Sequence, residues 1–338
     1  MQFTTRLASS PASLNFPLPT TQSSSWQRIR TQNITCGSLW QTQIELPEIP
    51  TEHIIVPSYA CSSSSYQYQW SLGQSASNTA CVLQPITALD ASAHVSFRAA
   101  NETAEQLTAK IDCWHTTAPT PPMQACLTVY LAQTNEPPEN DLVALSVRPI
   151  DMDMGQLPTQ SIINQRPPAL SQMQARPEIA QRICSPTATA MAIAAKDAES
   201  QWLHAIEHCL DPHTKAYGKW PLAVYWASQQ GRIGSIEAIS SWSSVVDILA
   251  EGCPIVCSIK FGKNSLPNAP LTQSGGHLVV LYGIQIELNQ GYALVMDPAS
   301  PTVREVPRRY PLTAFSKAWL AHRGGAYVFA PVNDAQNI

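Results

Sequence analysis

The sequence is organised around the stretch Arg182-Ile-Cys-Ser-Pro-Thr-Ala-Thr-Ala-Met191, in which one cysteine precedes a run of small and apolar residues. Ser185 is a capping residue type, and Pro186 suits a first helical turn, where its missing N–H costs nothing. Residues 188–203 contain neither glycine nor proline, so they predict a helix that continues through Leu203. A thiol at a helix N-terminus lies at the positive end of the helix dipole, which favours the thiolate. Cys184 is therefore a candidate nucleophile, although most cysteines simply fill small buried sites.

Two strands joined by a short polar turn are predicted further along the chain. The first is the apolar run 278–284, directly after His277, and the second is 292–296, directly before Asp297. Such a pair forms an antiparallel hairpin, in which the start of the first strand lies beside the end of the second. We therefore expect His277 and Asp297 at the same open end of this hairpin.

These residue types suit covalent catalysis. A histidine that exchanges a proton with a thiol, itself oriented by a carboxylate, is the nucleophile–base–orienter arrangement of acyl-transfer enzymes. Upstream, Gln172 offers a side-chain amide that can donate to an oxyanion. The candidate catalytic residues are Gln172, Cys184, His277 and Asp297, and this chain order is that of papain-like enzymes.

Five short motifs follow one another in the second half of the chain: Ser171-Gln172-Met173, Cys184-Ser185-Pro186-Thr187, Gly218-Lys219-Trp220-Pro221, Gly275-Gly276-His277-Leu278 and Asp297-Pro298-Ala299. In this order they resemble the motifs of the bacteriocin-processing-peptidase-like branch of the papain-fold cysteine peptidases. The segments 315–320 and 324–327 are similar to the closing segment of that family. The resemblance covers about half of the chain. It implies a papain-like fold and a peptide or protein substrate.

Three positions depart from the family's usual pattern. Ile183 stands where the family often has Trp, Lys219 where Asn is common, and Met296 where Asn commonly precedes the Asp. None of these positions is a proposed catalytic group, so the resemblance implies the same chemistry in a pocket of altered shape.

Length and charge restrict the remaining possibilities. A chain of 338 residues suggests about two domains. With 20 basic and 24 acidic residues, the formal net charge is −4, which argues against a nucleic-acid partner. The sequence contains no phosphate-binding glycine loop and no stretch long enough for a membrane-spanning helix. Its oligomeric state is left open.

The first residues, Met1-Gln-Phe-Thr-Thr-Arg-Leu-Ala-Ser-Ser-Pro11, lack the apolar core of a secretory signal. As written, the sequence predicts a cytoplasmic protein, and export by a route without a cleaved signal stays open. Nine cysteines, an odd number, are compatible with mostly free thiols in that compartment.

The first half of the chain consists of short alternating runs separated by turn residues. Regularly spaced runs of this kind, without helical periodicity, predict a β-sandwich; they occur at 54–59, 66–72, 94–98, 107–114 and 125–131. We place the domain boundary in the irregular segment near residue 155, giving a β-sandwich domain at 1–155 and a peptidase domain at 156–338. The sandwich is equally well explained as a substrate- or surface-binding module and as a structural companion of the peptidase.

Two groups of side chains have some features of metal sites. Cys113 and His115 would share one face of a strand, and His204 and His208 are spaced four apart on a predicted helix. Neither group has a further ligand at a diagnostic position, so packing explains the first and a solvated or capping pair the second. We therefore expect no metal and no cofactor.

The sequence predicts an α+β protein in which an N-terminal β-sandwich precedes a papain-like domain of helices packed on an antiparallel sheet. Its predicted function is hydrolysis of peptide bonds by a cysteine peptidase. Two alternatives stay open: a papain-fold amidase, deamidase or acyl transferase with the same site, and a non-catalytic binding protein with a vestigial peptidase domain.

Overall fold

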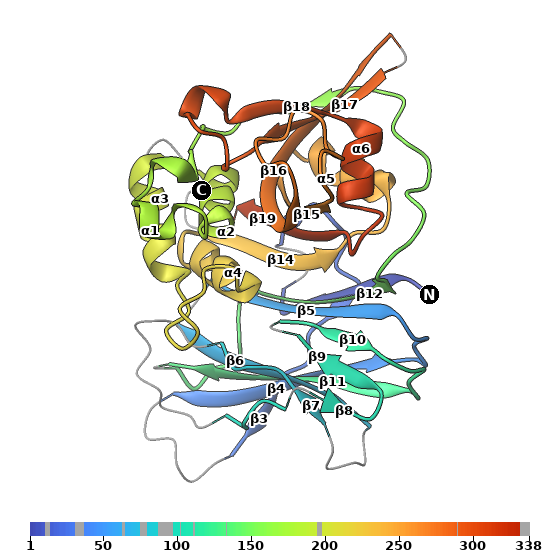
Figure 1. The fold of residues 1–338 in the computed structure, drawn as a ribbon. Helices are drawn as coiled ribbons and strands as arrows, with labels where there is room; N and C mark the ends of the chain where they lie inside the picture. Colours follow the sequence, from blue (N-terminus) through green and yellow to red (C-terminus); the bar gives the residue numbers. More distant parts are fainter. Residues whose placement is uncertain are drawn as a thin grey trace.

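The computed structural model describes residues 1–10, 14–30, 37–62, 65–74, 80–86, 97–101, 103–110, 112–132, 134–194, 198–288 and 290–331. Within these ranges the first half of the chain is all β and the second half combines helices with an antiparallel sheet (Figure 1). The predicted α+β class is therefore confirmed.

The N-terminal half forms two sheets. The seven-stranded sheet has the order β2-β1-β12-β5-β10-β9-β8, with β1 (Phe3–Ala8), β2 (Gln22–Ser23), β5 (His53–Cys61), β8 (Thr103–Ala104), β9 (Leu107–Ala109), β10 (Trp114–Thr116) and β12 (Asp141–Pro149). The five-stranded sheet has the order β3-β4-β11-β6-β7, with β3 (Gln27–Ile29), β4 (Ser38–Leu46), β6 (Tyr66–Gly73), β7 (Cys81–Val82) and β11 (Met123–Leu131). Alternate side chains from both sheets, including Trp70, Leu127 and Leu145, meet in one apolar core, as a sandwich requires.

One predicted strand is wrong and another is only partly described. The run 107–114 is divided between β9 and β10, which pair antiparallel, so the chain turns back between Ala109 and Trp114. A turn bond from the Lys110 N–H to the Cys113 carbonyl closes this reversal, and the alternation of side chains gave no sign of it. In the predicted strand 94–98, residues 94–96 lie outside the described ranges, and 97–98 belong to no strand.

The second half of the chain is built on a third sheet. Its order is β14-β19-β15-β16-β17-β18, and β13 also pairs with β16; the strands are β13 (Ile162–Ile163), β14 (Arg232–Ala238), β15 (Ile255–Phe261), β16 (Ser274–Glu287), β17 (Gln290–Met296), β18 (Pro307–Pro311) and β19 (Gly325–Pro331). The antiparallel pairing of β16 with β17 confirms the predicted hairpin. The predicted division at 155/156 stays a prediction; β12 ends at Pro149, and β13 is the next strand along the described chain.

Helices lie at two sides of this sheet. In Figure 1, α1 to α4 gather at one side and α5 and α6 at the other. Their bounds are α1 (Pro177–Ala180), α2 (Cys184–Ile193), α3 (Ala198–His208), α4 (Trp220–Gln229), α5 (Trp242–Ala250) and α6 (Leu312–Ala318), with 3₁₀ turns η2 (Gln172–Gln174) and η3 (Val303–Glu305).

The helix that begins near Cys184 is shorter than predicted. It ends at Ile193, because Ala194 has an extended ψ of 128°, and α3 is a separate helix. Its N-cap is Ile183, without a side-chain cap. Instead of capping, Ser185 bonds to Tyr327 through its Oγ, at 3.0 Å from the phenol oxygen.

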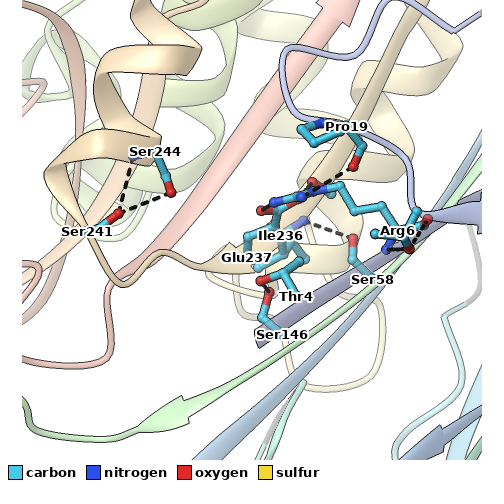
Figure 2. Close-up of polar contacts among 11 residues, drawn as sticks. Thr4, Arg6, Pro19, Ser58, Ser146, Ile236, Glu237, Ser241 and Ser244 are labelled. Atoms are coloured by element: carbon cyan, nitrogen blue, oxygen red, sulfur yellow. Dashed lines mark hydrogen bonds and ion pairs between the residues drawn. The ribbon is translucent and has the colours of Figure 1, made fainter. Parts of the chain in front are cut away.

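The two halves are held together by buried polar contacts. Strands β5 and β12 of the sandwich pack against β14, and β5 also contacts α4. Arg6 on β1 donates from Nε and Nη2 to the two carboxylate oxygens of Glu237 on β14, at 2.7 and 2.5 Å (Figure 2). Next to this pair, the Ile236 N–H donates to Ser58 Oγ at 2.9 Å.

Arg148 at the end of β12 makes a second connection. Its side chain is fully buried and donates to the carbonyls of Ile239 at 2.5 Å and Leu320 at 2.7 Å, both in the second half of the chain. Burial lowers the pKa of Arg148 to about 10, which leaves it charged at neutral pH. Gly324, at φ +61°, lies so close to this guanidinium and to the Ile239 carbonyl that no side chain fits there.

We expect Arg148→Met to destabilise the protein by about 2–5 kcal/mol. Two buried carbonyls lose their donor, and each unsatisfied group costs about 1–3 kcal/mol. Thermal and urea unfolding measure the loss. Arg309→Met is the matched control, because Arg309 and Glu287 are both about 45% exposed and such pairs contribute at most about 1 kcal/mol. Equal losses in the two variants would show that Arg148 does not hold the halves together.

Candidate active site

Cys184 is the first residue of α2. The helix is enclosed on all sides, with every residue from Ser185 to Met191 buried, whereas Cys184 itself is half-buried. Small side chains make this enclosure possible, and the buried hydroxyls of Thr187 and Thr189 donate to carbonyls one turn back. The half-buried thiol thus lies at the first turn of a tightly packed helix, where the first N–H groups have no intrahelical acceptor.

His277 and Asp297 come together at the open end of the β16–β17 hairpin. His277 lies three residues into β16, and Asp297 follows the last residue of β17. Imidazole Nε2 and carboxylate Oδ1 are 2.7 Å apart, and both side chains are buried. Because Asp297 holds Nε2, Nδ1 is the ring nitrogen left for the thiol of Cys184, with which His277 interacts through a hydrogen bond and charge.

Asp297 is itself fixed by two further donors. The Tyr310 hydroxyl on β18 donates to Oδ2 at 2.5 Å, and the Ala299 N–H donates to Oδ1 at 2.9 Å. The sequence did not predict a role for Tyr310. Its position depends on the pairing of β18 with β17, and no local pattern marks it.

Cys184, His277 and Asp297 shift one another's pKa values toward their charged forms. Burial raises the pKa of Cys184, but the hydrogen bond and positive charge of His277 outweigh burial and bring that pKa below its ordinary value. Burial lowers the pKa of His277, but the Asp297 carboxylate and the thiolate raise it above the usual range. Burial likewise raises the pKa of Asp297, and the His277 charge and the Tyr310 hydroxyl more than reverse that effect. Each of the three shifts thus favours a charged form: thiolate at Cys184, imidazolium at His277 and carboxylate at Asp297.

Two backbone N–H groups add to this effect. Those of Ser185 and Leu278 act on the Cys184 sulfur and lower its pKa further. The first comes from the α2 N-terminus and the second from the strand that carries His277, so both elements of the site stabilise the thiolate.

Gln172 lies on the segment that closes the same end of the fold. Its backbone N–H donates to the Pro298 carbonyl at 2.9 Å, directly after Asp297, and Ser171 Oγ donates to the Ser300 carbonyl at 2.6 Å. The Gln172 side chain donates from Nε2 to the Ala180 carbonyl at 2.7 Å, while its buried Oε1 has no partner among the described residues. One amide N–H is thus committed to Ala180 and the other stays available, and the predicted oxyanion role stays a prediction.

The motif around Lys219 has a structural role that the sequence did not reveal. Lys219 precedes α4, is buried, and pairs with Asp211, with Nζ and Oδ2 2.8 Å apart. The N–H of Trp220 donates at 3.1 Å to Asp112 of the sandwich, which thereby caps the start of α4. The first turn of this helix is thus bound from both halves of the molecule.

The histidine pair on α3 is engaged in local contacts. The rings of His204 and His208 are 3.8 Å apart between centroids, and the indole N–H of Trp226 donates to His204 Nδ1 at 3.0 Å. In the parts of the chain that the structure describes, no three His, Cys, Asp or Glu side chains gather as metal ligands. The expectation of no metal stays a prediction.

No helix within the described ranges is both long and apolar enough to cross a membrane.

Residues 165–327 match the Peptidase_C39 like family, so this part of the chain is a domain of that family. The match contains Gln172, Cys184, His277 and Asp297. It confirms the resemblance of the ordered motifs. A search of curated proteins found no match to the chain.

We expect Cys184 to react with iodoacetamide at pH 6 about tenfold or more faster than Cys126. An ordinary thiol with a pKa of about 8.5 is only about 0.3% ionised at that pH, whereas the lowered pKa of Cys184 gives it a larger fraction of thiolate. Cys126 is a matched control because it is also half-buried, and burial raises its pKa. Mass spectrometry of labelled peptides over time measures both rates.

In His277→Ala, Cys184 should react no faster than Cys126, because the imidazolium is the main cause of the lowered pKa of Cys184. Equal labelling of the two cysteines in the unaltered protein would contradict the assignment of a thiolate.

Proposed function

Because residues 165–327 form a domain of the Peptidase_C39 like family, we propose that the protein is a cysteine peptidase that hydrolyses peptide bonds. One observation supports this most strongly: the half-buried thiol at the start of α2 interacts with an imidazole that a buried carboxylate holds at 2.7 Å. In this proposal Cys184 is the nucleophile, His277 the acid and base, and Asp297 the orienting group.

In the first half of the reaction the Cys184 thiolate attacks the scissile carbonyl carbon, and the electrons of the C=O bond move to oxygen. The oxyanion accepts hydrogen bonds from the Cys184 N–H and from the amide N–H of Gln172 that Ala180 does not use. When the C–N bond breaks, the leaving amine takes a proton from Nδ1 of His277. The acyl group remains on sulfur as a thioester, and the imidazole is neutral.

In the second half water completes hydrolysis. Neutral His277 takes a proton from the attacking water, and collapse of the second tetrahedral intermediate releases the acid and the thiolate. The imidazolium is thereby restored, and Asp297 and Tyr310 keep the ring in one orientation in both steps.

The two glycines before His277 leave open space through which a substrate could reach the histidine. Gly275 and Gly276 are exposed, neither has a positive φ, and a Cβ added at either position meets no atom within 4 Å. The fold therefore does not require glycine there. A substrate whose leaving amine reaches His277 must pass beside these residues, so we assign the open space to its main chain.

The proposal is tested by cleavage profiling of a proteome-derived peptide library with the full-length protein and Cys184→Ala. We expect new amino termini with the unaltered protein and none with the variant, because the substitution removes the nucleophile of the proposed mechanism. Ammonia release without new termini would indicate a deamidase, and transfer to an added amine an acyl transferase. Identical products from both proteins would refute Cys184 as nucleophile.

We expect Gly276→Val to lower kcat/KM on a peptide substrate by at least about tenfold, roughly 1.4 kcal/mol of barrier. Its side chain occupies the space beside His277 without disturbing the fold. Alkylation of Cys184 by small iodoacetamide should stay within about threefold of the unaltered protein, which separates blocked access from a damaged thiolate. Gly262→Val is the control, since an added Cβ there is 3.9 Å from its nearest neighbour, Ser265 Oγ. Equal effects of both substitutions would remove the role assigned to Gly276.

A further inference from the structure

The outer face of the five-stranded sheet is rich in glutamine. Alternation along β4, β6 and β11 sends the apolar residues into the sandwich and leaves Gln41, Gln43, Gln69, Gln124 and other polar side chains on the opposite face. The strand register places these side chains in rows across the sheet. Thr128 pairs with both Gln41 and Gln69, and Cys126 pairs with both Gln43 and Ser71.

This face lies on the far side of the sandwich from the peptidase domain. The seven-stranded sheet is the middle layer, because its strand β5 is buried along its whole length, with alternate residues in the sandwich core and in the core of the second half. Figure 1 shows β4, β11 and β6 beyond that layer, away from β14 and the α2 helix. A ligand on this outer face is therefore separated from Cys184 by two sheets.

The glutamine-rich face is hollowed into a pocket of about 370 Å³, a volume in the range of small-molecule sites. The floor is polar, with Cys126 interacting with the side chains of Gln41, Gln43, Ser71 and Thr128. Apolar side chains add part of the wall: Ile29, Leu39 and Phe97.

One wall of the pocket is fixed by Gln69. This buried amide donates from Nε2 to the carbonyls of Leu83 at 3.1 Å and Arg98 at 2.8 Å, and its Oε1 accepts the Arg98 N–H at 3.1 Å. All three bonds go to main-chain atoms, so Gln69 holds the rim in place. This wall is thus ordered by contacts within the protein, without a ligand.

The residues that line the pocket indicate which class of ligand it binds. Among the described lining residues Arg98 alone carries charge at neutral pH, since burial raises the pKa of the Cys126 thiol. Side-chain amides offer a donor and an acceptor together, which matches sugar hydroxyls. In the part of the lining that the structure describes, a cationic ligand finds no opposite charge and an anionic ligand finds only Arg98. The apolar wall residues suit the C–H faces of sugar rings. We infer that this pocket binds a short neutral oligosaccharide, so that the sandwich attaches the enzyme to a glycan-bearing surface.

The test uses full-length Cys184→Ala protein and isothermal titration with maltotriose, cellotriose and triacetylchitotriose; trigalacturonate serves as the charged comparison. We expect at least one neutral trisaccharide to bind with a Kd of about 1 mM or lower. At saturation it should slow alkylation of Cys126 by N-ethylmaleimide at least about fivefold. Trigalacturonate should neither bind nor protect.

Gln43→Ala should weaken binding by about tenfold and reduce the protection of Cys126 at the same trisaccharide concentration. Gln43 is exposed, so the variant should keep its fold, which circular dichroism checks. Gln27→Ala is the matched control, an exposed glutamine on β3 of the same sheet but outside the pocket lining. The inference is overturned if no neutral trisaccharide binds, if only the charged saccharide binds, or if Gln43→Ala binds as well as the control.

Discussion

The hydrogen bond between His277 and Asp297 is the constraint on which the site depends. Both side chains are almost completely buried, and a buried charge is stable only with a partner and with its remaining hydrogen bonds satisfied. The carboxylate meets this condition through His277, Tyr310 and the Ala299 N–H. Three neighbouring strands, β16, β17 and β18, must therefore pair in one register before the imidazole has its orientation.

The two halves of the chain are not independent cores joined by a tether. Apolar side chains of the sandwich, among them Ile54, Val56 and Leu142, belong to the same core as α2 and β16, while Leu222 and Tyr225 of α4 pack into the sandwich core. Arg6 and Arg148 cross the boundary as buried cations, and Asp112 caps α4 from the opposite side. Removing the sandwich would expose apolar surface, take Arg6 from Glu237, and take the Arg148 donor from the Ile239 and Leu320 carbonyls. Together these losses cost far more than the loss of one surface contact. A structural role for the sandwich is thus compatible with a binding role for its far face.

Sequence reasoning succeeded where the signal is local. The apolar runs that flank a polar turn gave the β16–β17 hairpin, and its geometry alone brought His277 beside Asp297. It failed where the outcome depends on tertiary contacts. Nothing in residues 184–203 marks the end of α2 at Ile193. The bends that divide β9 from β10, and the arrival of Tyr310 at Asp297, likewise follow from long-range pairing. The glutamine-rich face was not predicted: β4 was not among the expected strands, and only the register of β4, β6 and β11 shows that the amides share one surface.

The position of Cys184 follows from the way α2 is buried. A helix that contacts protein on all sides cannot use a one-sided apolar stripe, and its residues must be small or internally satisfied. Alanines supply the small surfaces, while Thr187 accepts the indole N–H of Trp202 at 2.8 Å and donates its own hydroxyl proton to the Ile183 carbonyl. These bonds fix the helix along its length, so the thiol at its first residue has little freedom relative to the sheet that carries His277. Because the enclosing groups come from α3, α4 and the strands beside His277, the same packing that orders the core also sets the distance between the Cys184 thiol and the His277 ring.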